Sequence, residues 1–135
     1  MNNYAILAAM ILLPATAQAA TWTSGFQRGI NYYGVKDGAL ELTLTCDPNG
    51  AYSPPQNFMK AFMDGRVVDG SGTLQSDGQT VTIGFEQGTA FKQETEDGAW
   101  KMALSIISSP EGFSFTHNNQ SVKVTPSNQL QHDCK

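Results

Sequence analysis

The sequence predicts a mainly β protein: a small antiparallel β-sandwich or partly open barrel with one short helix and one long-range disulfide. Three observations support this prediction. Residues Gly38–Cys46 alternate apolar and polar side chains, Asp-Gly pairs that begin at residues 37, 64, 77 and 97 separate short apolar runs, and Cys46 and Cys134 are the two cysteines of the chain. Together they favour short antiparallel strands, joined by tight turns and held by one covalent link.

Gly38–Cys46 is the clearest predicted strand, and we expect the rest of the chain to be organised around it. Every second residue from Leu40 to Cys46 is apolar. Three polar residues alternate with them: Glu41, Thr43 and Thr45. Strict alternation of this kind is typical of a strand that is half buried against a core.

The N-terminal segment has the pattern of a secretory signal peptide. An unbroken apolar run over residues 5–13 is followed by Pro14 and by small residues that end in Ala17-Gln18-Ala19. This pattern predicts cleavage between Ala19 and Ala20, although the residues before the run carry no Lys or Arg; the alternative is a buried N-terminal helix or strand. The run is too short to span a membrane.

We therefore expect residues 1–19 to be a signal peptide and residues 20–135 to be one domain, located in the periplasm or secreted, with no transmembrane span in the mature chain. In that compartment Cys46 and Cys134 are expected to pair. The alternative, a redox-active pair, needs closely spaced cysteines such as Cys-x-x-Cys, which the chain lacks. The predicted disulfide would tie the tail to the end of the Gly38–Cys46 strand.

The chain before this strand predicts an entry strand or coil over residues 20–30, with Trp22 packed at the edge of the core, and a short strand over residues 31–35. Tyr32 and Tyr33 should point to opposite faces of that strand. The Asp37-Gly38 pair predicts the turn into the Gly38–Cys46 strand, because glycine readily supplies the positive φ of a tight hairpin.

Three further Asp-Gly pairs, which begin at Asp64, Asp77 and Asp97, predict further turns of an antiparallel meander. Between the second and third pairs, residues 80–85 alternate cleanly, and Gly84 inside that run suggests a bulge or a close backbone approach.

Residues Ala99–Ser108 fit both a helical stripe and a strand alternation. We favour a short helix with Asp97 as its N-cap, because Pro110 and Gly112 end the segment. A last hairpin is predicted over residues 113–125, after which the tail returns to bring Cys134 to Cys46.

The charge pattern argues against nucleic acid as a partner. The net charge is −4, and the eight basic residues are scattered along the chain rather than clustered. Binding to phosphates needs a concentrated basic face. We expect neither a nucleic-acid surface nor a polybasic membrane patch.

Catalytic signals are weak. His132-Asp133-Cys134 contains the residue types of a triad, but three consecutive residues cannot converge on one substrate atom, and an oxidised cysteine is not a nucleophile. The other histidine, His117, lies among amides that indicate an exposed turn. No nucleotide-binding loop or metalloprotease motif is present. We therefore assign no catalytic, cofactor-binding or metal-ligating residue and do not expect an enzyme.

The best candidate for binding a partner is the Pro48–Pro55 loop. Tyr52, Pro54 and Pro55 place an aromatic residue beside two prolines on a segment that turn residues mark as a loop. Aromatic residues on rigid loops are common interaction anchors. The alternative is that Tyr52 packs against its own domain.

These observations favour a small, exported, non-catalytic binding protein, an inhibitor or immunity-type factor that acts on a protein partner. One alternative is an accessory or structural component of a cell-envelope assembly, joined through an exposed strand edge. A third is a hydrolase with an unrecognised carboxylate site. None of the motifs is specific to one family, so no functional residue is inferred from a resemblance.

Overall fold

The computed structural model describes residues 19–135. The predicted signal peptide lies outside the described residues except for Ala19, and it stays a prediction. The described chain forms ten strands, a short 3-10 helix η1 and one α-helix. Their bounds are β1 Thr23–Gln27, β2 Ile30–Asp37, β3 Leu40–Cys46, β4 Phe58–Met63, β5 Arg66–Val67, β6 Gly70–Ser76, β7 Gln79–Phe85, β8 Thr89–Phe91, η1 Lys92–Glu94, α1 Asp97–Ile107, β9 Phe113–His117 and β10 Gln120–Val124.

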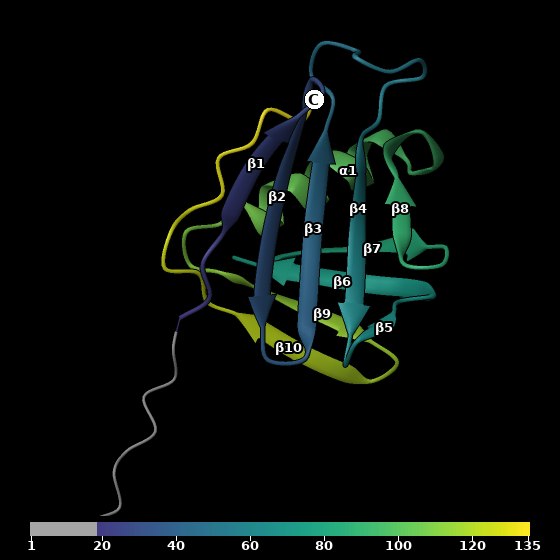
Figure 1. The fold of residues 1–135 in the computed structure, drawn as a ribbon. Helices are drawn as coiled ribbons and strands as arrows, with labels where there is room; N and C mark the ends of the chain where they lie inside the picture. The colour runs from purple at the N-terminus through teal and green to yellow at the C-terminus, as the bar shows by residue number, and fades with distance from the viewer. Residues whose placement is uncertain (1–18) are drawn as a thin grey trace, which may run out of the picture.

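The strands form two antiparallel sheets (Figure 1). In the first sheet the order is β1-β2-β3-β4-β5, with β8 also paired to β4; in the second it is β10-β9-β6-β7. The strands of the second sheet run across those of the first, as in an orthogonally packed sandwich (Figure 1). The sheets do not close into a barrel. The predicted mainly β class, with one helix and one disulfide, is confirmed.

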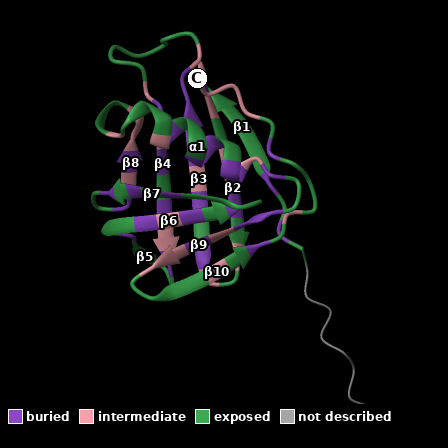
Figure 2. Cartoon of the chain, turned by 180° about the vertical axis from the view of Figure 1, so that it is seen from behind, coloured by how far each residue is buried: buried purple, intermediate pink, exposed green. Residues whose placement is uncertain are grey.

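The predicted organising strand is β3, at the centre of the first sheet between β2 and β4. The side chains of Leu40, Leu42, Leu44 and Cys46 are fully buried, at 0% exposure. They face the second layer, and Trp22 is buried at the edge of this core, as predicted. In the view from behind, buried residues follow one another along β3, between the two layers (Figure 2).

Helix α1 lies alongside β7 and completes the second layer (Figures 1 and 2). The helical reading of the ambiguous segment is confirmed, because the residues of the helical stripe are buried: Trp100, Ala103, Leu104 and Ile107. The predicted N-cap is wrong by one residue. The carboxylate of Glu96 accepts hydrogen bonds from the backbone N–H groups of Gly98 and Ala99, at 2.9 and 2.8 Å.

Of the four turns predicted at Asp-Gly pairs, two form as predicted. Asp64-Gly65 joins β4 to β5 and Asp77-Gly78 joins β6 to β7, each with positive φ at both residues. The Asp37-Gly38 turn is shifted by one residue, because β2 extends through Asp37 and the turn is Gly38-Ala39. The fourth predicted turn is wrong, because Asp97 and Gly98 form the first turn of α1.

The predicted irregularity at Gly84 is also wrong. Gly84 pairs regularly with Ser71, and the space above it is open. The close approach occurs at Gly72, where a Cβ atom would lie 2.7 Å from the Phe115 ring and 2.8 Å from the Phe85 ring. Those two rings pack edge to face across the sheet. Gly72 therefore makes room for a contact between two aromatic residues that are distant from it in sequence.

The tail after β10 has no helix or long strand and runs back to the end of β3 (Figure 1). Its first residues pair with Ala20, whose N–H donates to the Thr125 carbonyl at 3.2 Å. Its last residues include Cys134, which forms the predicted disulfide with Cys46. Within residues 19–135, no helix combines the length and apolar character that crossing a bilayer requires.

Candidate functional site

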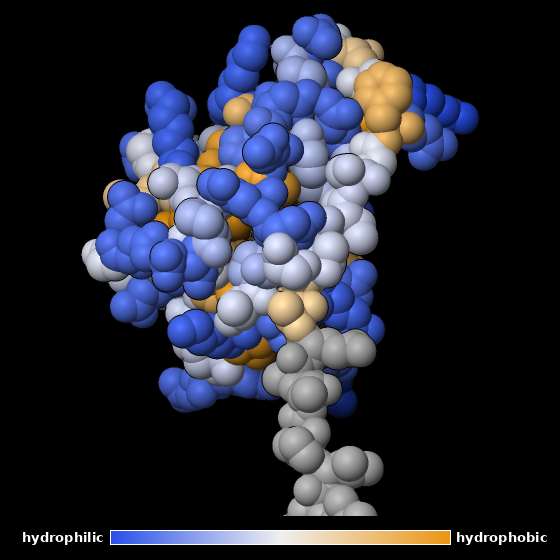
Figure 3. Space-filling model, turned by 90° about the vertical axis from the view of Figure 1, so that its left-hand side faces the viewer, coloured by the Kyte–Doolittle hydropathy of each residue, from blue (hydrophilic) through white to orange (hydrophobic). Residues whose placement is uncertain are grey.

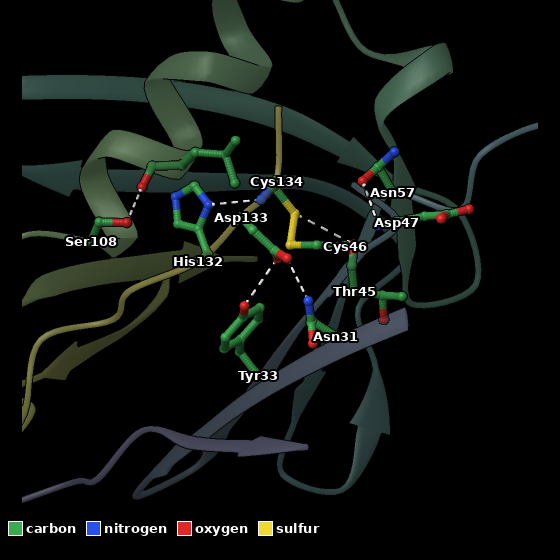
Figure 4. The surroundings of a disulfide bond; sticks show 11 residues. Asn31, Tyr33, Thr45, Cys46, Asp47, Asn57, Ser108, His132, Asp133 and Cys134 are labelled. Carbon is green, nitrogen blue, oxygen red and sulfur yellow. Dashed lines mark hydrogen bonds between the residues drawn. A yellow bond between two sulfur atoms is a disulfide. The ribbon is translucent and has the colours of Figure 1, made fainter. Parts of the chain in front are cut away.

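Three irregular parts of the molecule meet where β3 ends: the disulfide, the C-terminal tail and the Pro48–Pro55 loop (Figures 1 and 4). Cys46 is the last residue of β3, and Asp47 joins it to the loop. The disulfide therefore anchors the tail and the base of the loop to the same strand end.

On the tail side, the carboxylate of Asp133 binds two residues of β2. It accepts a hydrogen bond from the side-chain amide of Asn31 and another, of 3.0 Å, from the Tyr33 hydroxyl (Figure 4). Burial, and then the Asp133 carboxylate, raise the pKa of Tyr33 above its ordinary value of 10.0. Tyr33 thus stays a neutral donor, and the tail is held to the inner side of the first sheet.

His132 and the two cysteines cluster beside this contact. The ligating atoms of Cys46, His132 and Cys134 lie within 4.8 Å of one another. The sulfurs are bonded to each other, so neither is a thiolate that could ligate a metal or attack a substrate. His132 Nδ1 accepts a hydrogen bond of 3.2 Å from the Cys134 N–H. Burial lowers the pKa of His132 below 6.5, and the Asp133 charge offsets part of that shift.

On the loop side, the side chain of Asp47 organises the backbone. Asp47 is only 3% exposed, and its carboxylate accepts hydrogen bonds from three backbone N–H groups: Ala51 at 2.6 Å, Tyr52 at 3.1 Å and Gln56 at 3.1 Å. Burial by itself would raise the pKa of this carboxyl, but the backbone donors outweigh it, and the pKa lies below the ordinary 3.8. Asp47 is therefore an internal scaffold of the loop rather than a free acid.

The predicted partner-binding residues all lie on this loop, but they face different surroundings. Pro54 and Pro55 line a cavity of about 470 Å³, which we call the loop cavity; Lys92 and Lys135 also line it. Tyr52 lies outside the walls of this cavity and is 41% exposed. The structure thus brings Pro54 and Pro55 to a concave surface and leaves Tyr52 on the outside of the loop.

The loop cavity has two acidic residues, Asp47 and Asp97, and two basic residues, Lys92 and Lys135, on its walls. Asp97 pairs with Lys101 at 2.8 Å, and Asp47 is occupied by backbone donors. In the part of the chain that the structure describes, neither Lys92 nor Lys135 has an ion-pair partner. The charged side chains of the lining that make neither an ion pair nor a hydrogen bond among the described residues are therefore the two lysines.

The sequence analysis did not anticipate a second concave surface, on the outward face of the first sheet. A cavity of about 440 Å³ lies over β1–β4, and its walls include Tyr32, Thr43, Thr45 and Lys60. The sequence indicated this surface through the polar residues that alternate with the buried residues of β3. We used that alternation only to identify the buried residues. Tyr32 points outward and Tyr33 inward, as predicted.

His117 lies at the end of β9, before the Asn118-Asn119 turn. Its Nδ1 atom is 2.9 Å from the Ser71 carbonyl oxygen, so this ring is occupied by the backbone of the neighbouring strand.

We compared the chain with models of protein families, with curated proteins and with solved structures, and none of them matches it. The interpretation of both concave surfaces therefore depends on their geometry and chemistry.

Proposed function

We propose that this protein is a small, exported, non-catalytic binding protein of the inhibitor or immunity type, and that the Pro48–Pro55 loop and the loop cavity contact its protein partner. The observation that carries the proposal is the internal bonding of the loop. The buried Asp47 carboxylate accepts three backbone hydrogen bonds and so holds the loop in one shape.

A loop held in this way is suited to binding. Its backbone is already ordered in the free protein, so a partner does not have to meet that entropic cost on association. Pro54 and Pro55 add φ angles that are fixed by their rings. Tyr52 then offers a large, partly exposed contact with only two side-chain torsions to restrict.

The charges indicate the chemistry of the partner. Lys92 and Lys135 line the loop cavity without an ion-pair partner among the described residues. A protein segment that inserts a carboxylate side chain between them, while its apolar surface covers Pro54 and Pro55, would complement both features. Binding should therefore weaken as ionic strength rises.

The chemistry of the remaining side chains supports a non-catalytic role. Cys46 and Cys134 are joined in a disulfide, so neither offers a thiolate nucleophile. The disulfide also supports export, because such bonds persist in oxidising compartments.

The test is a pull-down from an envelope extract of the expressing cell, followed by titration of the purified partner. Tyr52→Ala should reduce affinity by about 1–2 kcal/mol or more, as for an aromatic anchor, and should change stability by less than about 1 kcal/mol. Tyr32→Ala is the matched control, because both tyrosines are 41% exposed. Unchanged affinity for Tyr52→Ala would refute the proposal, and a large loss of stability would place Tyr52 in the core.

A second candidate is an accessory role in an envelope assembly, favoured by the edge strand β1. All five of its residues are exposed, and Phe26 is 72% exposed. Among the described strands β1 pairs only with β2, so no strand covers its other edge, although the tail lies beside its first residues. The side of the molecule that bears β1 and the tail is mostly hydrophilic, with a small hydrophobic patch that stands out (Figure 3).

The same pull-down distinguishes the two candidates. Recovery of a multiprotein membrane complex that is lost with Phe26→Ser and kept with Tyr52→Ala would favour the edge strand. Recovery of one soluble partner with the opposite pattern would favour the loop.

A further inference from the structure

The outward face of the first sheet contains an elongated trough. Two adjoining cavities, of about 440 and about 320 Å³, share Thr23, Gly34 and Thr43 among their walls. We call their combined surface the outer trough. Along β3 it extends from Thr45 to Glu41, which is about 13 Å at the usual rise of a strand.

Gly34 forms the floor of the trough because it has no side chain. Gly34 lies in β2 opposite Thr23 of β1 and Thr43 of β3. A Cβ atom there would make ordinary contacts, 3.6 Å from Thr23 Oγ1 and 3.7 Å from Thr43 Cγ2. A larger side chain would therefore fit the backbone at this position and fill the hollow.

The hydroxyl of Thr45 is available to a polar ligand in the trough. Thr45 is only 4% exposed, yet its side chain lies on the outward, polar half of β3, opposite to the disulfide at Cys46 (Figure 4). Within residues 19–135 this hydroxyl has no hydrogen-bond partner, and it is not among the fully enclosed polar atoms without one. Because this hydroxyl is not enclosed, it is reachable from the trough and free to bond a ligand there.

Aromatic side chains stand at the same end of the trough. Tyr32 and Phe58 are the cross-strand neighbours of Thr45 on either side, in β2 and β4. Lys60 stands next along β4, with its Nζ atom 5.6 Å from the centre of the Phe58 ring. At this end of the trough a ligand would thus meet an aromatic surface, threonine hydroxyls and the ammonium group of Lys60.

We propose that the outer trough is a binding site for a saccharide chain. The apolar face of a pyranose ring can stack on Tyr32 or Phe58, and its hydroxyls can exchange hydrogen bonds with Thr43 and Thr45, because each threonine hydroxyl both donates and accepts. A protein strand would not use the face of a sheet in this way, since its backbone pairs at edges. Nucleic acid would need more positive charge than Lys36 and Lys60 supply beside Glu41.

The shape of the trough selects among saccharides. A β-1,4-linked chain is extended and presents the flat faces of its rings, so it can lie along the strands of a sheet. An α-1,4-linked chain curves and would leave the floor at Gly34. The trough therefore suits the β-1,4 linkage.

The experiment is a titration of the purified, oxidised protein with cellohexaose and chitohexaose, and with maltohexaose as the α-linked comparison. Binding is measured by isothermal titration calorimetry and by changes in the NMR chemical shifts of the backbone amides. At least one β-linked hexasaccharide should bind at least tenfold more tightly than maltohexaose. The largest shifts should fall on residues 43–45 and 58–60, not on Pro48–Pro55.

Three variants test the mechanism. Gly34→Val should weaken binding at least tenfold by filling the floor, whereas Gly84→Val, in a strand of the second sheet where a Cβ atom would meet no neighbour within 4 Å, should leave it unchanged. Thr45→Val removes only the hydroxyl and should weaken binding without lowering the melting temperature, because the hydroxyl has no partner in the free protein. If Gly34→Val folds poorly, Thr45→Val still tests the site.

Three results would overturn the saccharide site: no binding of either β-linked chain at millimolar concentration, equal binding of maltohexaose, or binding that Thr45→Val and Gly34→Val leave unchanged. Tyr52→Ala should not affect saccharide binding, so the outcome is separate from that of the proposed protein-binding loop.

Discussion

The tail and the Pro48–Pro55 loop are both irregular, and both are attached at the end of β3, but they are held in opposite ways. The tail is bound by residues that are distant in sequence: Asn128 by Trp22, Asp133 by Asn31 and Tyr33, and Cys134 by Cys46. The loop is held by Asp47, the residue that directly precedes it. Long-range contacts make the tail part of the domain's stability, whereas local contacts give the loop a shape and leave its outer side chains free.

The largest effect should come from the covalent link. Cys46→Ser should reduce the free energy of unfolding by about 4–5 kcal/mol, the chain-entropy value for a cross-link that spans 88 residues. Denaturant unfolding of the oxidised wild type and of the variant measures this loss. A loss below about 1 kcal/mol would show that the non-covalent contacts of the tail suffice, and it would contradict the contrast drawn here.

A smaller loss should follow when the start of the tail is released. Asn128 accepts a hydrogen bond of 2.8 Å from the Trp22 N–H and donates one of 3.0 Å to the Trp22 carbonyl. Asn128→Ala leaves both backbone groups unpaired and should reduce the free energy of unfolding by about 1–3 kcal/mol. Gln131→Ala is the control, because Gln131 is exposed, and its effect should lie within about 0.5 kcal/mol.

On the loop side, Asp47→Ala should act locally. The amides of Ala51, Tyr52 and Gln56 lose their acceptor, so their hydrogen exchange should accelerate while the amides of β3 stay protected. Equal acceleration in β3 would show that the loop and the sheet open as one unit.

Acid should reproduce this effect in the wild type. The pKa of Asp47 is lower in the folded protein than its ordinary value of 3.8, so its stabilising contribution is complete above that value. The contribution is lost as the pH falls through the lower, folded-state pKa. Loop-amide exchange, corrected for its intrinsic pH dependence, should therefore rise in that range in the wild type and stay flat in Asp47→Ala.

The smallest expected effect concerns His132. Burial lowers its pKa in the folded protein below 6.5, so protons bind more readily to the unfolded chain. Its contribution to stability is complete above pH 6.5 and declines as the pH falls from there towards the folded-state pKa. His132→Gln should remove this part of the pH dependence. A stability profile that is unchanged by the substitution would show that the ring is solvated as in the unfolded chain.

The candidate sites were predictable to different degrees. Tyr52, Pro54 and Pro55 could be assigned to a loop because proline and turn residues act locally. That Pro54 and Pro55 line a cavity with Lys92 and Lys135 could not be foreseen, because the two lysines belong to η1 and to the tail. The outer trough was missed because its floor, Gly34, needs β1 and β3 on either side before the missing side chain becomes a hollow.

The sequence by itself determined the features that depend on near neighbours. The alternation of β3, the Asp64-Gly65 and Asp77-Gly78 turns and the helical stripe around Trp100 all follow from backbone preference and period, and the structure has each of them. The pairing of Cys46 with Cys134 was also determined, since the chain offers no other partner.

Only the tertiary structure decided which strands lie beside one another and what their faces enclose. Nothing in the sequence indicates that Gly72 is required, because the Phe115 ring that packs over it belongs to β9. Gly84, which the sequence marked as irregular, pairs regularly with Ser71. Contacts between residues that are distant in sequence depend on how the two layers pack, and a local sequence pattern does not specify which residues of the other layer it will contact.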